Sequence, residues 1–74
     1  MNKANSTTVT GGLETAGLSY VLTSDGAGNF SVLIPMATMN GDQMLALVNI
    51  LVPGGVAMDG VNANWNVDKG ITIS

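Results

Sequence analysis

Apolar residues between Asn40 and Val52 recur at a helical spacing. Counting from the first of them, they fall at i, i+1, i+3, i+4, i+7 and i+8, which is typical of a broad stripe along one side of a helix. These positions are Met44, Leu45, Leu47, Val48, Leu51 and Val52. The sequence therefore predicts a helix that presents one apolar side to a core.

The start and the end of this helix are also marked. Asn40 can accept a hydrogen bond from the backbone two or three residues on, and Gln43 stands where a capping box requires Glu or Gln. Pro53 disfavours helical geometry at Val52 and is followed by two glycines. We predict a helix from Gly41 to Val52. A buried strand is the alternative, because several of these residues are β-branched.

Two stretches before the helix alternate between faces and indicate a β-hairpin. Leu18, Tyr20 and Leu22 share one face of the first, and Phe30, Val32 and Ile34 share one face of the second. Between them lies the turn-forming loop SDGAGN, whose glycines and flanking Asp and Asn favour a reversal. The predicted hairpin runs from Leu18 to Met36, with Pro35 at an edge or a bulge.

A C-terminal β-meander is predicted from Val56 to Ile73. Its clearest strand alternates over seven residues, with Val61, Ala63, Trp65 and Val67 on one face and Asn62, Asn64 and Asn66 on the other. An Asp-Gly turn precedes this strand, and Asp68 to Gly70 turn the chain into Ile71, Thr72 and Ile73. The expected fold class is mainly β (α+β): a hairpin, one short helix and the meander.

The first twelve residues are polar and rich in Asn, Ser and Thr. We predict that residues 1–12 form an N-terminal arm, either flexible or adding a strand to a neighbour through the β-prone patch around Thr7 and Val9. Residues 13–74 then form a small β-rich domain.

Composition indicates that this domain depends on partners. The chain has 74 residues, of which 46% are apolar and 9% charged, and it contains neither Cys nor His. A chain of this size buries little surface and usually needs disulfides, a metal or a partner subunit. Without Cys and His, partner subunits remain, so we expect a homo-oligomer.

The same composition argues against other classes of protein. A net charge of -3 with only two basic residues disfavours nucleic acid as a partner. The longest apolar run is too short to span a membrane, and the N-terminus has no secretory h-region. Without His or Cys the usual nucleophile and base arrangements are excluded, and the acidic residues are scattered. We therefore expect no enzyme activity and no cofactor. We also expect no metal site, because Asp25 and Asn29 offer too few ligands for Ca²⁺.

The candidate interface residues are those that offer amides, a strand or an aromatic anchor to a neighbour. Trp65 is the only Trp, and its place on the apolar face favours a core position over an anchor in a partner. The Asn row is either a solvated strand face or a surface that pairs with a neighbouring strand or binds glycans. The full set is Thr7, Val9, Asn62, Asn64, Trp65 and Asn66.

The run Tyr20 to Phe30, YVLTSDGAGNF, resembles a hairpin phrase that recurs in bacteriophage tail fibres and other virion surface proteins. The similarity covers about eleven residues. In those fibres a Ser-Trp commonly follows the turn, whereas Phe30 and Ser31 stand here. The resemblance implies a virion component made in the host cytoplasm, such as a capsid decoration or fibre-associated protein, with other virion proteins as partners.

A bacteriocin-like, membrane-active peptide is the alternative. Gly11 and Gly12 form a double glycine, which ends the leader peptides of some bacteriocins. Cleavage after Gly12 leaves Lys69 as the one basic residue against five acidic ones, whereas such peptides are usually cationic. The preferred interpretation is therefore a structural subunit of a larger assembly.

Overall fold

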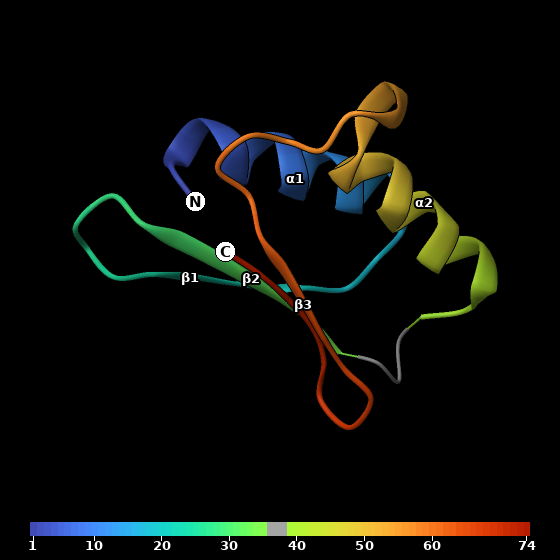
Figure 1. Ribbon diagram of the computed structural model, residues 1–74. Coiled ribbons are helices and arrows are strands. Elements are labelled where there is room, and N and C mark those ends of the chain that lie inside the picture. The colour runs from blue at the N-terminus through green and yellow to red at the C-terminus, as the bar shows by residue number, and fades with distance from the viewer. Residues whose placement is uncertain (36–38) are drawn as a thin grey trace.

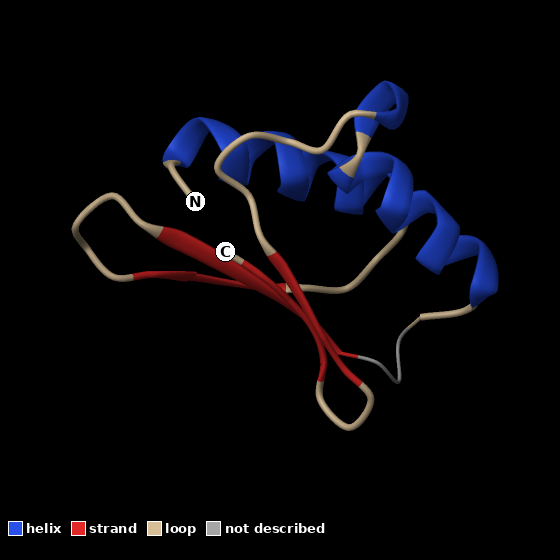
Figure 2. Ribbon diagram, in the orientation of Figure 1, coloured by secondary structure: helices blue, strands red, loops and turns tan. Residues whose placement is uncertain are grey.

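Helices and strands form two separate layers in the computed structural model, which describes residues 1–35 and 39–74 (Figures 1 and 2). Helices α1 (Lys3–Thr15) and α2 (Gly41–Leu51) lie on one face of a four-stranded antiparallel sheet. The strands are β1 (Val21–Ser24), β2 (Phe30–Pro35), β3 (Ala63–Asn66) and β4 (Gly70–Ile73). Their order across the sheet is β1-β2-β4-β3. Helices make up 38% and strands 25% of the described residues, so the fold is α+β, and "mainly β" overstates the strands.

The predicted hairpin is confirmed as β1 and β2. The two strands pair antiparallel with Val21 opposite Leu33 and Ser24 opposite Phe30. The reversal is closed by the backbone N–H of Asp25, which donates to the carbonyl oxygen of Asn29 at 3.2 Å. The predicted end of the hairpin at Met36 lies outside the described residues.

The predicted helix is confirmed as α2, and its capping box is formed in both directions. Asn40 Oδ1 accepts from the backbone N–H of Gln43 at 2.9 Å, and Gln43 Oε1 accepts from the backbone N–H of Asn40 at 3.0 Å. The helix ends at Leu51 and is followed by a short 3-10 turn, η2 (Pro53–Gly55). Gly54 adopts a φ of 65° there, so the chain leaves the helical path.

The C-terminal meander is reduced to one hairpin. β3 and β4 pair antiparallel as predicted, with Trp65 opposite Ile71. Residues 56–58, however, form no strand. The backbone N–H of Met58 instead donates to the carbonyl oxygen of Leu51 at 3.1 Å, which ties this segment to the end of α2.

The predicted N-terminal arm is wrong, because most of residues 1–12 belongs to helix α1, which continues to Thr15. Asn2 caps the helix by accepting from the backbone N–H of Asn5 at 2.8 Å. Ser6, Val9 and Leu13 follow the i, i+3, i+7 spacing of one helix side, and all three are buried. The boundary expected between residues 12 and 13 therefore falls inside a helix.

Helix α1 is rich in residues of low helix propensity, which explains why the arm was expected. Thr hydroxyls hydrogen-bond to carbonyl oxygens four residues earlier, for example Thr7 to Lys3 at 3.0 Å and Thr15 to Gly11 at 2.9 Å. Such bonds give slight or no support to a helix in isolation. Contact with α2 and β2 therefore has to stabilise α1.

The core lies between the helices and the two central strands. Val32 and Ile34 of β2 and Ile71 and Ile73 of β4 are fully buried, whereas every residue of the outer strands β1 and β3 is exposed. The cluster of buried apolar residues is completed by the two helices and the segment after α1. Its members are Val9, Leu13, Leu18, Val32, Ile34, Leu47, Leu51, Ile71 and Ile73.

The two adjacent glycines of α1 provide a matched test of this packing. A Cβ added at Gly12 would lie 2.9 Å from Cγ1 of Ile50 on α2, whereas one added at Gly11 would meet nothing within 4 Å. We expect Gly11→Ala to stabilise the fold by about 0.5 to 1 kcal/mol through helix propensity. We expect Gly12→Ala to destabilise it by about 1 to 2 kcal/mol, because overpacking outweighs that gain.

Urea unfolding monitored by circular dichroism measures both changes. If the contact with Ile50 is the cause, Gly12→Ala combined with Ile50→Ala will show a favourable coupling relative to the sum of the single variants. Equal stabilisation by both glycine substitutions would contradict the close approach of the helices.

Candidate interaction site

Strand β3 places the predicted Asn row and Trp65 on opposite faces of the sheet. In the register with β4, Ala63 and Trp65 stand opposite Ile73 and Ile71, so they share the face that carries the helices. Asn62, Asn64 and Asn66 lie on the other face, which no helix covers in the described part of the chain. The predicted alternation is confirmed from Asn62 to Asn66, whereas Val67 already belongs to the turn that follows the strand.

Trp65 is not a core residue, although its face is the one expected. Its side chain is 49% exposed, because the helices cover the central strands and β3 is the edge. It lines an apolar groove of about 310 Å³ between β3, the linker before it and α2. The lining residues are Val48, Leu51, Val52, Ala57, Val61, Ala63 and Trp65.

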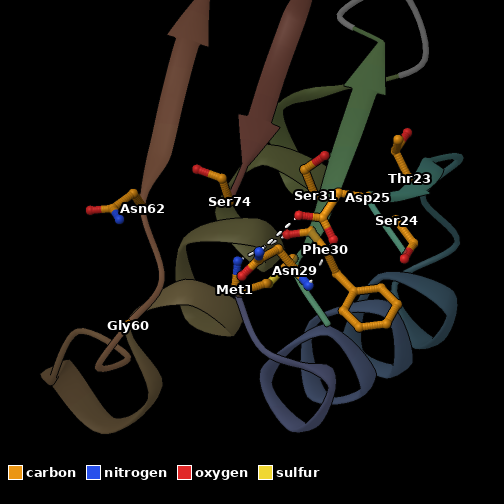
Figure 3. Close-up of a pocket in the computed structure, with 10 residues that line it drawn as sticks. All are labelled: Met1, Thr23, Ser24, Asp25, Asn29, Phe30, Ser31, Gly60, Asn62 and Ser74. Atoms are coloured by element: carbon orange, nitrogen blue, oxygen red, sulfur yellow. Dashed lines mark hydrogen bonds between the residues drawn. The ribbon is translucent and has the colours of Figure 1, made fainter. Parts of the chain in front are cut away.

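The three Asn side chains have different surroundings. Asn66 Oδ1 accepts from the backbone N–H groups of Asp68 and Lys69 at 2.9 and 3.0 Å, so it shapes the turn between β3 and β4. Asn62 pairs with Ser74 through its backbone and is one of the residues that line the pocket shown in Figure 3. Asn64 lies opposite Thr72 and makes no side-chain hydrogen bond to any described residue. Its amide is therefore available.

The hydrogen-bond pattern leaves one side of β3 unpaired. Asn62 and Ser74 exchange both backbone hydrogen bonds, at 2.7 and 2.8 Å. Because an antiparallel ladder alternates, Asn64 and Asn66 also turn their backbone groups toward β4, and Ala63 and Trp65 turn theirs outward. Within residues 1–35 and 39–74, nothing pairs with these outward N–H and carbonyl groups. The apolar groove thus runs beside an open strand edge.

The other edge, at β1, has a different character. Tyr20, just before β1, donates its hydroxyl to Glu14 Oε1 at 2.6 Å, and this hydrogen bond raises the pKa of the tyrosine. Asp25 follows the other end of the strand. Carboxylates thus flank the β1 edge at both ends, whereas β3 is followed by Asp68 and Lys69, whose charges sum to zero.

Two predicted interface residues, Thr7 and Val9, belong to α1 and not to a free strand. Val9 is fully buried in the core. Thr7 is exposed, but its hydroxyl is engaged by the carbonyl oxygen of Lys3. Neither residue lies at the edge formed by β3.

A second, more polar pocket of about 480 Å³ lies where the hairpin loop approaches Met1 and Ser74 (Figure 3). Met1 occupies the place beside β2 beyond the end of β4: its nitrogen donates to Phe30 O at 2.9 Å, and Phe30 N–H donates to Met1 O at 2.8 Å. The Asp25 carboxylate nearby is already engaged by Asn29 Nδ2 at 2.8 Å and by the N–H of Ala27 at 2.7 Å. The polar groups of this pocket therefore hold the loop and the N-terminal residue in place.

Among the described residues, no three His, Cys, Asp or Glu side chains come together as a metal site would require. None of the helices in that part of the chain has the length and apolar character needed to cross a bilayer. Comparisons with protein-family models, with curated proteins and with solved structures gave no match. The fold and the open edge define the class: a small two-layer α+β protein whose most distinctive site is a strand edge beside an apolar groove.

The hairpin loop gives a prediction about pH. Hydrogen bonds from the Asn29 side chain, and then from backbone N–H groups, hold the pKa of Asp25 below its ordinary value of 3.8. The ionised carboxylate therefore stabilises the folded loop above pH 3.8, and this contribution is lost as the pH falls through the lower folded pKa. We expect Asn29→Ala to move the pKa of Asp25 up toward 3.8, because the first of these donors is removed.

NMR titration of the Asp25 carboxyl carbon measures this shift. Asp25→Asn serves as the control, since it removes the titrating group and with it this part of the acid sensitivity. An unchanged pKa of Asp25 in Asn29→Ala would show that the side-chain amide does not stabilise the carboxylate.

Proposed function

We propose that this protein is a non-catalytic structural subunit that acts by associating with copies of itself and with other proteins of a larger assembly. The observation that carries the proposal is the open, uncharged edge of β3 beside the Trp65 groove. Unpaired strand edges bind other strands, and soluble proteins usually protect them with Lys, Pro, bulges or a covering segment. Strand β3 contains neither Lys nor Pro.

Exposed apolar side chains also support association. Val67 is 86% exposed, Leu45 64% and Val48 45%, in a chain with only 9% charged residues. Val48 lines the groove beside Trp65, and contiguous apolar residues typically mark an interaction surface. Uncharged amide and hydroxyl groups nearby lose less on desolvation than charged groups would.

The uncovered face of the sheet is a further surface of this kind. Val21 and Leu33 form a pair across β1 and β2 there and are 55% and 37% exposed. Thr72 and Asn64 continue the same row across β4 and β3. The row contains no charged residue, so it also suits contact with another protein.

We propose a bacteriophage virion as the assembly, with a role in capsid decoration or association with a fibre. This part of the proposal rests on the resemblance of the run Tyr20 to Phe30 to the hairpin phrase of virion surface proteins. That run forms β1, the loop and the first residue of β2, and the hydrogen bond between Asn29 and Asp25 bridges its exposed loop. An exposed, stiffened hairpin suits contact with other virion proteins.

The position of the double glycine weighs against the bacteriocin alternative. Gly11 and Gly12 lie within α1, and Gly12 packs closely on Ile50. A leader-processing protease would need an extended segment at this site, so α1 would have to unfold first. The structural role is therefore the one we propose.

Self-association can be followed through Trp65, the only Trp of the chain. We expect the protein to elute in size-exclusion chromatography with light scattering at a multiple of 7.5 kDa and to shift toward 7.5 kDa on dilution. Because Trp65 is half exposed in one copy, its fluorescence emission should move to shorter wavelength as the copies associate.

Trp65→Ser should weaken association at least tenfold and leave the circular dichroism spectrum unchanged, since this side chain is not part of the core. Tyr20→Phe, which keeps the ring at the opposite edge of the sheet, is the matched control. A mass of 7.5 kDa at every concentration up to the millimolar range would contradict a self-associating subunit.

A further inference from the structure

The free edge of β3 has a two-fold complementary pattern. Its outward backbone groups belong to Ala63 and Trp65, which are symmetrically placed about Asn64. If two such edges run antiparallel with Asn64 opposite Asn64, Ala63 of one copy stands opposite Trp65 of the other, and both pairs can exchange N–H to carbonyl hydrogen bonds. We propose that two copies of this chain dimerise in this way, through antiparallel β3 strands about a two-fold axis at Asn64.

This inference rests on the proposed function and specifies the surface and the partner. The resulting sheet would have eight strands, with order β1-β2-β4-β3 in one copy followed by its reverse in the other. Such a contact is isologous, so it closes at two copies.

The helix-side face of the joined edge fits in size and polarity. The bulky Trp65 meets the partner's Ala63 in this register. This is a large-to-small apolar pair, of the kind that stabilises neighbouring strands.

The opposite face matches amides with amides. Asn64 meets the partner's Asn64 as a pair without backbone hydrogen bonds, where side chains approach most closely. Asn62 meets the partner's Asn66. The Oδ1 atom of Asn66 accepts hydrogen bonds within its own turn, but its Nδ2 group can still donate to Asn62 across the axis. The row of amides thus gains partners across the axis.

The strand alone is too small to supply the contact area of a stable dimer. A stable dimer buries about 800 Å² on each copy, which is roughly a fifth of the 4457 Å² of this chain. β3 has four residues, so the flank of α2 must contribute. Val48 lines the groove beside Trp65, and Leu45 precedes it by one helical turn, so both can be covered by the partner's edge.

Charge distinguishes the β3 edge from the β1 edge. Antiparallel pairing of two β1 edges about Thr23 would bring the Glu14 and Tyr20 end of one copy to the Asp25 loop of the other, and like charges would face each other. At the β3 edge the charged residues nearest in sequence are Asp68 and Lys69 of the turn to β4, whose charges sum to zero. A second copy therefore fits β3 better than β1.

A disulfide across the axis tests the register, because the chain contains no Cys of its own. Asn64→Cys places a thiol against its own copy at a strand position whose Cα separation suits a disulfide. With oxidised glutathione we expect a covalent dimer to form at least tenfold faster than with Thr23→Cys at the β1 edge or Thr72→Cys on β4. Asn62→Cys and Asn66→Cys should cross-link when mixed and not when each is oxidised alone.

Ala63→Pro provides an independent test. It removes an outward N–H without removing a hydrogen bond to β4, and edge strands tolerate Pro at such positions. We expect at least a tenfold loss of dimer affinity in light scattering with an unchanged circular dichroism spectrum.

The outcomes separate this inference from the proposed function. An oligomeric unmodified protein with rapid cross-linking at Asn64→Cys supports both. An oligomeric protein that cross-links faster at Thr23→Cys or Thr72→Cys, or at none of the three, overturns the β3 dimer and leaves self-association standing. A monomer at every concentration overturns both.

Discussion

Two short helices cover only the central pair of strands in this sheet, and that limit decides which parts of the chain remain accessible. Val32, Ile34, Ile71 and Ile73 are fully buried against the helix layer, while the outer strands have no buried residue. The buried side chains supply the favourable free energy of a small core. The same arrangement leaves Trp65 half exposed and the backbone of β3 open along one side.

Capping and turn residues in the sequence correctly predicted helix α2 and the β1–β2 hairpin. The capping box of Asn40 and Gln43 and the stop at Pro53 define α2 within a single stretch. The loop between Ser24 and Phe30 likewise defines its hairpin through Asp25 and the glycines. Helix α1 was not predicted, although its ends are also capped, because its Ser, Thr and Gly residues have low helix propensity and its stability comes from contact with α2 and β2. The local evidence for it was the capping Asn2, the spacing of Ser6, Val9 and Leu13, and Gly17, which ends the helix with a φ of 72°.

The sequence correctly predicted which residues of the candidate site share a face of β3, but it did not predict that Trp65 would remain exposed. Alternation places Ala63 and Trp65 on one face and the three Asn on the other, and the structure has this arrangement. Whether that first face is covered depends on the order of the strands, which is set by contacts between residues far apart in sequence. β4 pairs with both β2 and β3, so β3 is displaced to the edge. A strand with the same pattern at the centre of the sheet would have placed Trp65 in the core.

Symmetry limits what the β3 edge alone can build. A two-fold contact uses the same surface on both copies and closes at a dimer, so a larger assembly needs a second surface on each dimer. The sheet offers two: the β1 edge and the uncovered face with Val21 and Leu33. Repeated pairing at β1 would extend the sheet without limit, and the carboxylates of Glu14 and Asp25 at its ends oppose that pairing. The uncovered face carries no such charge, so if the proposed dimer assembles further, we expect it to stack face to face and not to extend the sheet.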